Sequence, residues 1–300
     1  MSPTLITISG PTCVGKTSFS IELAKKIDSE IISFDSRQFY REMSIGTAVP
    51  SKDELNSVKH HFIQHKSIHE IYTINDYTID FDNLIKKSFN KSRYIVLVGG
   101  SNLYLKSVIY GLDNIPQIPK EIRFQLNFDY KKKGITYLQN MLKKLDHNYY
   151  KNVDIQNHRR LIRALEVSIF TKKPFSDFLS SNKKEKYNNL SVVMNIDRSP
   201  LYKLINSRVD KMLESGLLDE AKRLHKFKDL NALNTIGYKE LFEYFEGRLS
   251  YEDSIELIKT NSRRFAKKQL TWLNNNGSHL WIKGSESIKN NLKILLQKIL

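Results

Sequence analysis

The chain has 300 residues and a formal net charge of +16, with an isoelectric point near 9.6, which favours a polyanionic partner such as nucleic acid unless the lysines only reflect a lysine-rich proteome. A hydrophobic fraction of 40% is enough for a folded core, in one large domain or two smaller ones. Cys13 is the only cysteine, so we expect neither an intrachain disulfide nor a cysteine-based zinc site. We see no leader segment and no run near the roughly 20 apolar residues that span a bilayer, so we expect a cytoplasmic protein.

The N-terminal segment has the order strand, glycine-rich loop, helix. The apolar run Leu5–Ile8 predicts a buried strand, and the apolar spacing from Phe19 predicts an amphipathic helix that ends near Ile27. Between them lies a match to the phosphate-loop pattern G-x-x-x-x-G-K-[ST], formed by Gly10, Pro11, Thr12, Cys13, Val14, Gly15, Lys16 and Thr17. In such a loop, backbone N–H groups surround phosphate oxygens, the lysine reaches the terminal phosphates and Thr17 would hold Mg²⁺. The pattern therefore predicts binding of a di- or triphosphate rather than a plain strand–helix corner.

Two further apolar runs predict buried strands. Glu30–Asp35 ends in the carboxylate of Asp35, and Tyr94–Val98 is followed by the turn Gly99-Gly100-Ser101-Asn102. Because open α/β sheets bind ligands at the carboxyl ends of their strands, we expect Asp35 to face the phosphate loop. The second strand does not end in an acidic residue, which argues against an NTP-hydrolysing motor or switch. Its glycines instead let Ser101 approach a ligand closely.

A histidine-rich stretch lies between these two strands. Its members are His60, His61, His65 and His69. Two of their intervals are four residues, a spacing that could place metal ligands on one helical face. However, Phe62 and Ile63 suggest a short strand, and no carboxylate completes a zinc motif, so metal binding is the weaker interpretation.

The rest of the chain predicts a helical insertion and a return to the sheet. A helix is expected at Tyr77–Phe89, and Gly111–Pro119 marks a boundary. From Lys120 to about Leu190 the patterns are helical and polar. The elements expected after it are a strand at Ser191–Ile196, helices at Leu201–Glu214, Leu217–His225, Tyr238–Phe245 and Tyr251–Leu273, a strand at His279–Ile282 and a terminal helix to Leu300. This order predicts an α/β fold, with a P-loop NTPase-like parallel sheet core at 1–114 and 190–300 and a helical insertion domain at 115–189.

Positive charge gathers on two of the predicted helices. One cluster is Arg159, Arg160 and Arg163, and the other is Arg263, Arg264, Lys267 and Lys268. Like charges four residues apart repel on an isolated helix, so an anion between them would explain the pattern. A solvated helix face is the alternative for each cluster alone.

The motifs match those of one enzyme family, in order, over most of the chain. The matching segments are Gly10–Thr17, Ile32–Tyr40, Ile45–Ala48, His60-His61, Leu97–Tyr104, Arg160–Val167, Ile236–Tyr238 and Arg264–Trp272. With these residues the sequence resembles the tRNA dimethylallyltransferases, or tRNA isopentenyltransferases, in the bacterial form without a C-terminal zinc finger. Together the segments are far more specific than the phosphate loop alone.

The resemblance implies transfer of a dimethylallyl group from its diphosphate to N6 of the adenine 3′ of the anticodon, with Mg²⁺ as cofactor. The phosphate loop would then hold a prenyl diphosphate rather than ATP, so a water-activating carboxylate is unnecessary. Asp35 would be the general base, Ser101 would hydrogen-bond near the bridging oxygen, and Arg123 would bind the diphosphate. The family usually has Thr at the position of Ser101, which keeps the hydroxyl.

The resemblance also implies that the insertion domain grips the anticodon stem-loop of tRNA. The implied tRNA contacts are Asp35, Ser36, Arg37, Gln38, Arg159, Arg160, Leu161, Ile162, Arg163, Ile236, Gly237, Tyr238, Lys239, Glu240 and, on the C-terminal basic helix, Arg264, Lys267 and Lys268. Gln156-Asn157-His158 stands where many relatives have Asn-Asp-Pro. No feature indicates an obligate oligomer or a membrane partner, so we expect a monomer.

Three alternatives remain open from the sequence. Transfer to free adenosine phosphates would not require the basic helices or the insertion. A small-metabolite or nucleotide kinase also begins with strand, phosphate loop and helix, and ATP turnover would identify it. A non-catalytic RNA-binding protein would not need Asp35 and Ser101 at facing strand ends.

Overall fold

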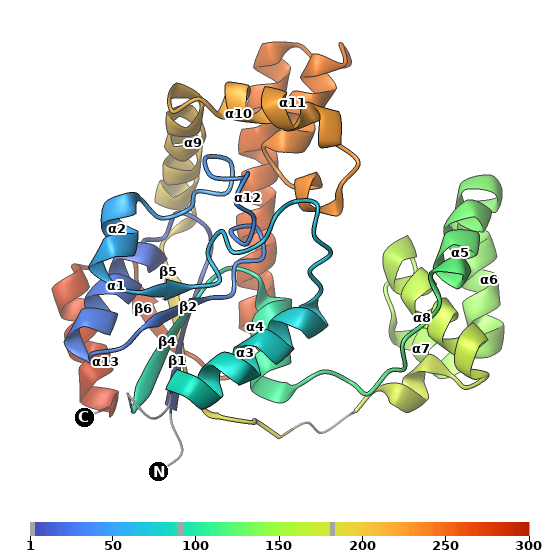
Figure 1. Ribbon diagram of the computed structural model, residues 1–300, viewed down its shortest axis with the longest axis horizontal. Coiled ribbons are helices and arrows are strands. Elements are labelled where there is room, and N and C mark those ends of the chain that lie inside the picture. Colours follow the sequence, from blue (N-terminus) through green and yellow to red (C-terminus); the bar gives the residue numbers. More distant parts are fainter. Residues whose placement is uncertain (1–3, 89–92, 181–183, 300) are drawn as a thin grey trace. The chain divides into compact units, whose positions relative to one another are not determined.

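The computed structural model describes residues 4–88, 93–180 and 184–299, and it divides into two compact units (Figure 1). The first unit comprises the chain up to Tyr110 and from Glu185 onward, and the second is Gly111–Lys184. The expected limits at 114/115 and 189/190 lie four and five residues further along the chain than these. They differ at the second limit because Asn188 already begins a strand of the first unit.

The first unit is built on one six-stranded parallel sheet (Figure 1). Its strands are β1 (Thr4–Ser9), β2 (Ile31–Ser33), β3 (His60–His61), β4 (Tyr94–Val98), β5 (Asn188–Asn195) and β6 (Leu280–Lys283). They lie in the order β3-β2-β4-β1-β5-β6, and every neighbouring pair is parallel. The predicted α/β class with a P-loop-type parallel sheet is confirmed. All carboxyl ends therefore meet at one edge of the sheet.

Side chains of the central strand alternate between two separate cores. Ile6 and Ile8 pack in the core under α1 (Lys16–Lys26) and α13 (Ile288–Ile299). Leu5 packs in the core under α3 (Ile74–Ser88) and α4 (Asn102–Tyr110). Because both faces are covered, the strands read as nearly continuous apolar runs, which is why they could be found in the sequence.

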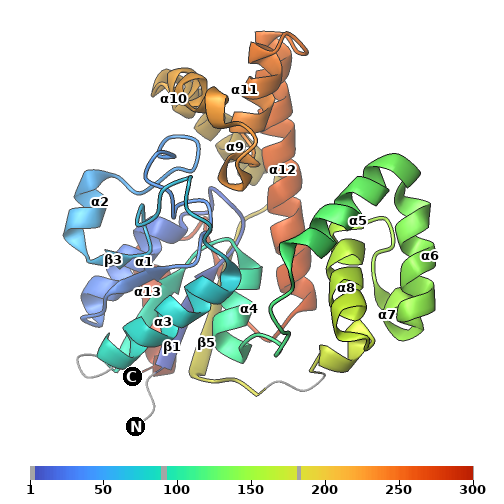
Figure 2. The ribbon, with the colours of Figure 1, turned by 45° about the vertical axis from the view of Figure 1, so that its right-hand side comes forward.

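A layer of helices extends the first unit beyond the sheet (Figure 2). It contains α9 (Arg198–Glu214), α10 (Leu217–Leu224), the 3-10 turns η2 (His225–Phe227) and η3 (Asn231–Leu233), α11 (Tyr238–Phe245) and α12 (Tyr251–Asn275). The short helix α2 (Lys52–Ser57) begins at a capping box between Ser51 and Glu54. In the ranges that the structure describes, no helix is long and apolar enough to cross a membrane.

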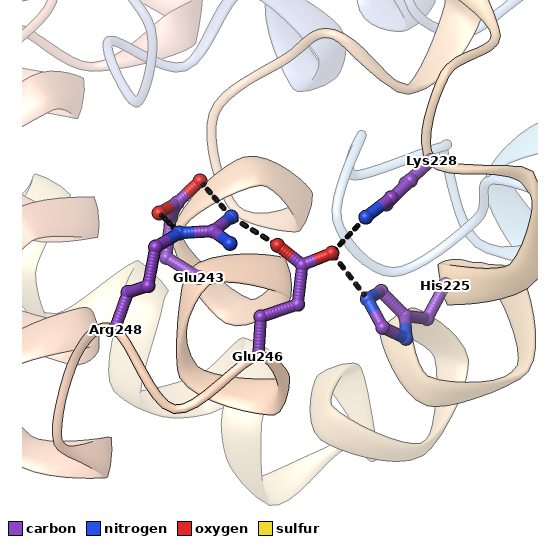
Figure 3. Close-up of polar contacts among 5 residues, drawn as sticks. All are labelled: His225, Lys228, Glu243, Glu246 and Arg248. Atoms are coloured by element: carbon purple, nitrogen blue, oxygen red, sulfur yellow. Dashed lines mark hydrogen bonds and ion pairs between the residues drawn. The ribbon is translucent and has the colours of Figure 1, made fainter.

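An ion cluster joins the end of α11 to η2 (Figure 3). The carboxylate of Glu246 pairs with His225, Lys228 and Arg248, and Arg248 also binds Glu243. The hydrogen bond from Lys228, followed by those from Arg248 and His225, lowers the pKa of Glu246 to about 2 despite an opposing effect of burial. The cluster is on the surface, so its contribution to stability is modest and falls with salt.

The second unit contains only helices among its described elements. These are α5 (Lys120–Lys133), α6 (Ile135–Leu145), α7 (His147–Asn152), α8 (His158–Thr171) and the 3-10 turn η1 (Phe175–Phe178). Gly134 separates α5 from α6 with φ at 77°, a conformation that glycine adopts without strain. Leu126, Leu138, Leu142 and Leu161 form the centre of its own core.

Several predicted element limits were wrong by a few residues. Strand β2 covers only Ile31–Ser33, so Asp35 lies in the turn after it. The short strand expected at Phe62 and Ile63 is instead β3 at His60–His61, because Phe62 has a positive φ of 61°. Helix α3 begins at Ile74, and its predicted end at Phe89 lies outside the described residues, as does Leu300.

Candidate active site at the carboxyl edge of the sheet

The phosphate loop connects β1 to α1 at the carboxyl edge. Gly10 has φ at 143° and packs so closely on the Met194 carbonyl that a Cβ would collide with it. The ammonium group of Lys16 lies inside the loop and donates to the carbonyls of Gly10 (3.0 Å) and Pro11 (2.6 Å). The pKa of Lys16 is lowered to about 8, mainly by burial and to a smaller extent by the positive charge of Arg208, while the carboxylate of Asp35 opposes the shift. The loop therefore presents a buried amine that an anion would help to charge.

Asp35 and Ser101 come together beside the loop, as the sequence predicted. Ser101 follows β4, and its Oγ accepts a hydrogen bond from the Ser36 backbone N–H at 3.0 Å and lies 3.0 Å from Ser36 Oγ. One carboxylate oxygen of Asp35 accepts from the Arg37 backbone N–H at 3.1 Å. A Cβ on Gly100 would lie 3.7 Å from the other, Oδ2. A carboxylate and a hydroxyl thus stand on neighbouring turns at the end of β2 and β4.

Arg208 reaches the phosphate loop, and sequence reasoning missed it. From α9 its Nη1 donates to Thr12 Oγ1 at 2.7 Å and lies 3.7 Å from Cys13 Sγ. The buried residues of α9 are Leu201, Ile205 and Val209, so Arg208 stands next to the apolar stripe rather than on the solvent side. A charged residue at such a position was the available signal.

Gln269 is the second residue that sequence reasoning did not single out. It lies on α12 with only 6% of its surface exposed. Its Oε1 accepts from the Thr12 backbone N–H at 3.1 Å, and its Nε2 donates to the Gly100 carbonyl at 3.1 Å. Gln269 is buried on the same face of α12 as Ala266 and Leu273. A polar residue on an apolar helix face is the sequence feature that could have identified it.

Two of the predicted RNA-contact side chains are used inside the protein. The Arg37 guanidinium donates to the carbonyls of Ala232 and Asn234, at 3.2 Å each. The Gln38 amide donates to the carbonyls of Thr47 and Ala48. Both residues, like Asp35 and Ser36, are half-buried, so they present only part of their surface to a ligand.

Five of the predicted tRNA contacts are buried, and their contact with tRNA stays a prediction. Leu161 and Ile162 belong to the core of the second unit. Gly237 is buried, Tyr238 is fully buried and donates its hydroxyl to Glu220 at 2.7 Å, and Glu240 accepts from the Gly237 backbone N–H at 2.8 Å. These five residues therefore have packing or capping roles within the protein.

The exposed members of the predicted set are nearly all cationic. They are Arg159 and Arg160 on α8, Lys239 on α11, and Arg264, Lys267 and Lys268 on α12, while Ile236 is half-buried. In the second unit, Arg123 and Arg163 both bind the buried carboxylate of Glu166, at 2.6 Å. The guanidinium of Arg123 is thus committed to this pair, and its contact with a diphosphate stays a prediction.

The histidines do not form a metal site in the described ranges. His61 binds Glu30 at 2.6 Å, and His60 Nδ1 lies 2.7 Å from the Val58 carbonyl. His65 packs between aromatic rings, among them Phe39 and Tyr72, and burial lowers its pKa to about 4. His60, His61 and His65 are half-buried and contact protein groups, whereas His69 is exposed.

The sequence of this chain is similar to those of known proteins. Residues 38–276 match the profile of the IPP transferases. The chain belongs to the IPP transferase family. A tRNA dimethylallyltransferase of Christiangramia forsetii is 49% identical over 300 residues, which are 100% of this chain and 99% of the relative.

Solved structures of the IPP transferase family have the same architecture. A full-length tRNA isopentenylpyrophosphate transferase from Bacillus halodurans is similar with a TM-score of 0.74 and 34% identity, over 99% of this chain and 95% of that one. A eukaryotic dimethylallyltransferase, described as acting on tRNA, is similar with a TM-score of 0.84 and 25% identity. The match covers 99% of this chain and 80% of that one. The family resemblance found in the sequence is confirmed.

Proposed function

We propose that this chain transfers a dimethylallyl group from dimethylallyl diphosphate to N6 of the adenine 3′ of the anticodon in tRNA. One observation carries the proposal: in a member of the IPP transferase family, a phosphate loop, a carboxylate and a hydroxyl meet at one sheet edge. The loop would bind the diphosphate, Asp35 would accept the proton, and Ser101 would donate a hydrogen bond to the leaving group. All of these residues belong to the first unit, whereas Arg123, the further residue expected at the diphosphate, lies in the second.

The transfer is a substitution at carbon. The lone pair of adenine N6 forms a bond to C1 of the dimethylallyl group, the bond from C1 to the bridging oxygen breaks, and its electron pair leaves with the diphosphate. The proton lost from N6 passes to the carboxylate of Asp35, the general base. This assistance matters because the N6 lone pair is delocalised into the ring and is a poor nucleophile.

The leaving diphosphate gains charge as the carbon–oxygen bond breaks. Lys16 and Arg208 carry positive charge at the loop, and backbone N–H groups at the start of α1 add partial positive charge. Ser101 Oγ accepts from the Ser36 N–H, and when Ser36 Oγ donates in the contact between the two hydroxyls, the Ser101 proton can be donated to the bridging oxygen. The methyl group that threonine would add is not needed for this hydrogen bond.

The residues present fit Mg²⁺ in the role that the family implies. Thr17, in the first turn of α1, offers a hard hydroxyl oxygen, and the diphosphate itself supplies further oxygens. The described residues offer no cluster of three acidic, histidine or cysteine ligands, which suits an ion held mainly by substrate oxygens and water. When bound, Mg²⁺ would neutralise charge on the diphosphate.

The tRNA would be held through its phosphates. The exposed cations on α8 and α12, above all Arg159, Arg160, Arg264 and Lys268, supply the charge for such contacts. The target adenine has to leave the anticodon stack, which costs a few kcal/mol that contacts in the site must repay.

Analysis of the modified nucleoside tests the proposal. Unmodified anticodon stem-loop RNA is incubated with the protein, Mg²⁺ and dimethylallyl diphosphate, and the digested RNA is analysed by mass spectrometry. We expect N6-dimethylallyl adenosine at the position 3′ of the anticodon, and none in a matched RNA that carries guanosine there. Modification at other adenines, or of free adenosine monophosphate at an equal rate, would contradict the proposal.

A further inference from the structure

The Gln269 side chain bridges the two turns that carry the chemistry of the site. Its amide oxygen binds the Thr12 backbone N–H in the phosphate loop, and its amide nitrogen binds the carbonyl of Gly100, next to Ser101. The loop and the turn follow β1 and β4, which are neighbours in the sheet. A single side chain therefore fixes the spacing between the diphosphate site and the Asp35–Ser101 pair.

The bridge requires a primary amide of this length. Thr12 N–H can only donate and the Gly100 carbonyl can only accept, so the bridging group must offer one acceptor and one donor. An ionised glutamate lacks the donor, and a methionine of similar shape offers neither strong group. Asparagine has the right chemistry but is shorter by one methylene.

Gly100 is shaped to admit this amide. A Cβ on Gly100 would collide with Gln269 Nε2, so any side chain there would push the amide away. The preceding Gly99 is required for another reason, since its Cβ would lie 2.6 Å from the Phe34 ring. The Gly-Gly pair before Ser101 thus serves one contact with Phe34, just after β2, and one with α12.

The anchoring of α12 keeps the amide in place. Ala266 and Leu273, one turn on either side of Gln269, are at most 1% exposed. On the solvent side the same helix exposes Lys267 and Lys268. The helix that carries these cations is therefore fastened directly to the phosphate loop.

We propose that Gln269 is a positioning residue, which holds the phosphate loop and the turn that carries Ser101 at the separation that the transfer step needs. This inference rests on the proposed function. In this role Gln269 acts through the Thr12 N–H and the Gly100 carbonyl rather than through contact with a substrate. Its loss would leave both binding surfaces intact and misplace the reacting groups relative to each other, and small displacements of reacting atoms are costly in rate.

Three variants test the inference: Gln269→Met removes both hydrogen bonds, Gln269→Glu removes only the donor, and Gln297→Met alters an exposed glutamine on α13 as the matched control. For each, we would measure the single-turnover transfer rate, the Kd for inorganic diphosphate, the Kd for stem-loop RNA and the melting temperature. We expect Gln269→Met to slow transfer by about 10- to 100-fold with both Kd values within about threefold of wild type. The control should transfer at the wild-type rate.

The Gln269→Glu variant adds a readout that a merely structural role would not move. When the carboxylate introduced by this substitution is protonated, it regains an O–H donor for the Gly100 carbonyl, so the rate deficit relative to wild type should shrink as the pH falls from 8 to 6. A Gln269→Met enzyme with the wild-type rate, or a Gln269→Glu deficit that is constant with pH, would overturn the inference alone. A wild-type protein that transfers no dimethylallyl group would overturn the proposed function and this inference with it.

Discussion

At the scale of single residues, the proposed reaction needs different contributions from Asp35 and Lys16. The two side chains interact electrostatically, since the charge of Asp35 raises the pKa of Lys16, although the larger effect of burial lowers it. One is assigned to the proton of the nucleophile and the other to the charge of the leaving group. Their separate roles can be measured separately.

Replacing the general base should affect turnover far more than binding. For Asp35→Asn, which keeps the shape of the side chain, we expect kcat to fall by on the order of 10²-fold or more, with the Kd for stem-loop RNA nearly unchanged. Asp53→Asn, at an exposed carboxylate on α2, serves as the control and should behave as wild type. A loss of RNA affinity with normal kcat would overturn the general-base role.

The lowered pKa of Lys16 predicts that the affinity for diphosphate depends on pH. In the free protein its pKa is about 8, and a bound anion favours the charged form, so above pH 8 binding must take up a proton. We expect the affinity for dimethylallyl diphosphate to fall by up to about tenfold per pH unit between pH 8 and 9.5. Titration calorimetry checks this, and Lys16→Met should bind weakly without that dependence. An affinity of the wild type that is constant from pH 7 to 9.5 would contradict the lowered pKa.

The residues of the site could be predicted from the sequence only where a local pattern marks them. Lys16 lies in a phosphate-loop motif, and Asp35 and Ser101 end apolar runs, so each has a signal within about ten residues. Arg208 and Gln269 reach the loop from positions 196 and 257 residues away from Thr12. Their partners are set by how α9 and α12 pack, which no local pattern contains.

At the scale of elements, the packing of α10 and α11 explains why part of a matching motif is structural. The carboxylate of Glu220 on α10 is 3% exposed and accepts from the backbone N–H groups of Ser44, Ile45 and Gly46. It also accepts from the hydroxyl of Tyr238 on α11. This network fastens the loop after β2 to two helices.

The network predicts that Tyr238 matters for stability and not for RNA contact. Removing its hydroxyl in Tyr238→Phe leaves the carboxylate of Glu220 with one donor fewer, so we expect the free energy of unfolding to fall by about 2 kcal/mol. Urea denaturation measures this change. The Kd for stem-loop RNA should stay within twofold of wild type, and a large loss of RNA affinity at unchanged stability would instead support a direct contact of Tyr238 with RNA.

Helices were easier to predict than strands and turns. The apolar periodicity of α11 gave Tyr238–Phe245, the same limits as in the structure, and α12 ends two residues beyond the predicted Leu273. Strand β2 was predicted at Glu30–Asp35, twice its length of three residues, although the Phe34 N–H still donates to the Val98 carbonyl of β4 at 2.9 Å. Backbone conformations such as the positive φ of Phe62 decide such limits, and side-chain patterns do not show them.

At the scale of the whole molecule, the positive charge is distributed unevenly. The second unit, Gly111–Lys184, has 15 of the 48 lysines and arginines but only seven of the 32 acidic residues, a formal charge of +8. Half of the net charge of the protein therefore lies in about a quarter of its length. Such a concentration fits a unit that binds a polyanion and would be costly without one.

The second unit should bind RNA with a strong salt dependence. For Arg159→Ala/Arg160→Ala, a double variant in exposed positions of α8, we expect about tenfold weaker binding of stem-loop RNA and a salt slope reduced by about 1–2. Fluorescence anisotropy over a range of salt concentrations measures both. The pair Lys25→Ala/Lys26→Ala on α1 is the matched control. An equal loss in the control would mean that only net charge matters.

The claim that the phosphate loop serves prenyl transfer, and not NTP chemistry, is tested most directly by diphosphate release. The protein is supplied with dimethylallyl diphosphate, Mg²⁺ and unmodified stem-loop RNA, without ATP, and released diphosphate is counted against dimethylallyl groups on the RNA. The account predicts one diphosphate per transferred group, with release that requires the RNA. ATP hydrolysis or phosphoryl transfer, with no dimethylallyl group on the RNA, would contradict it.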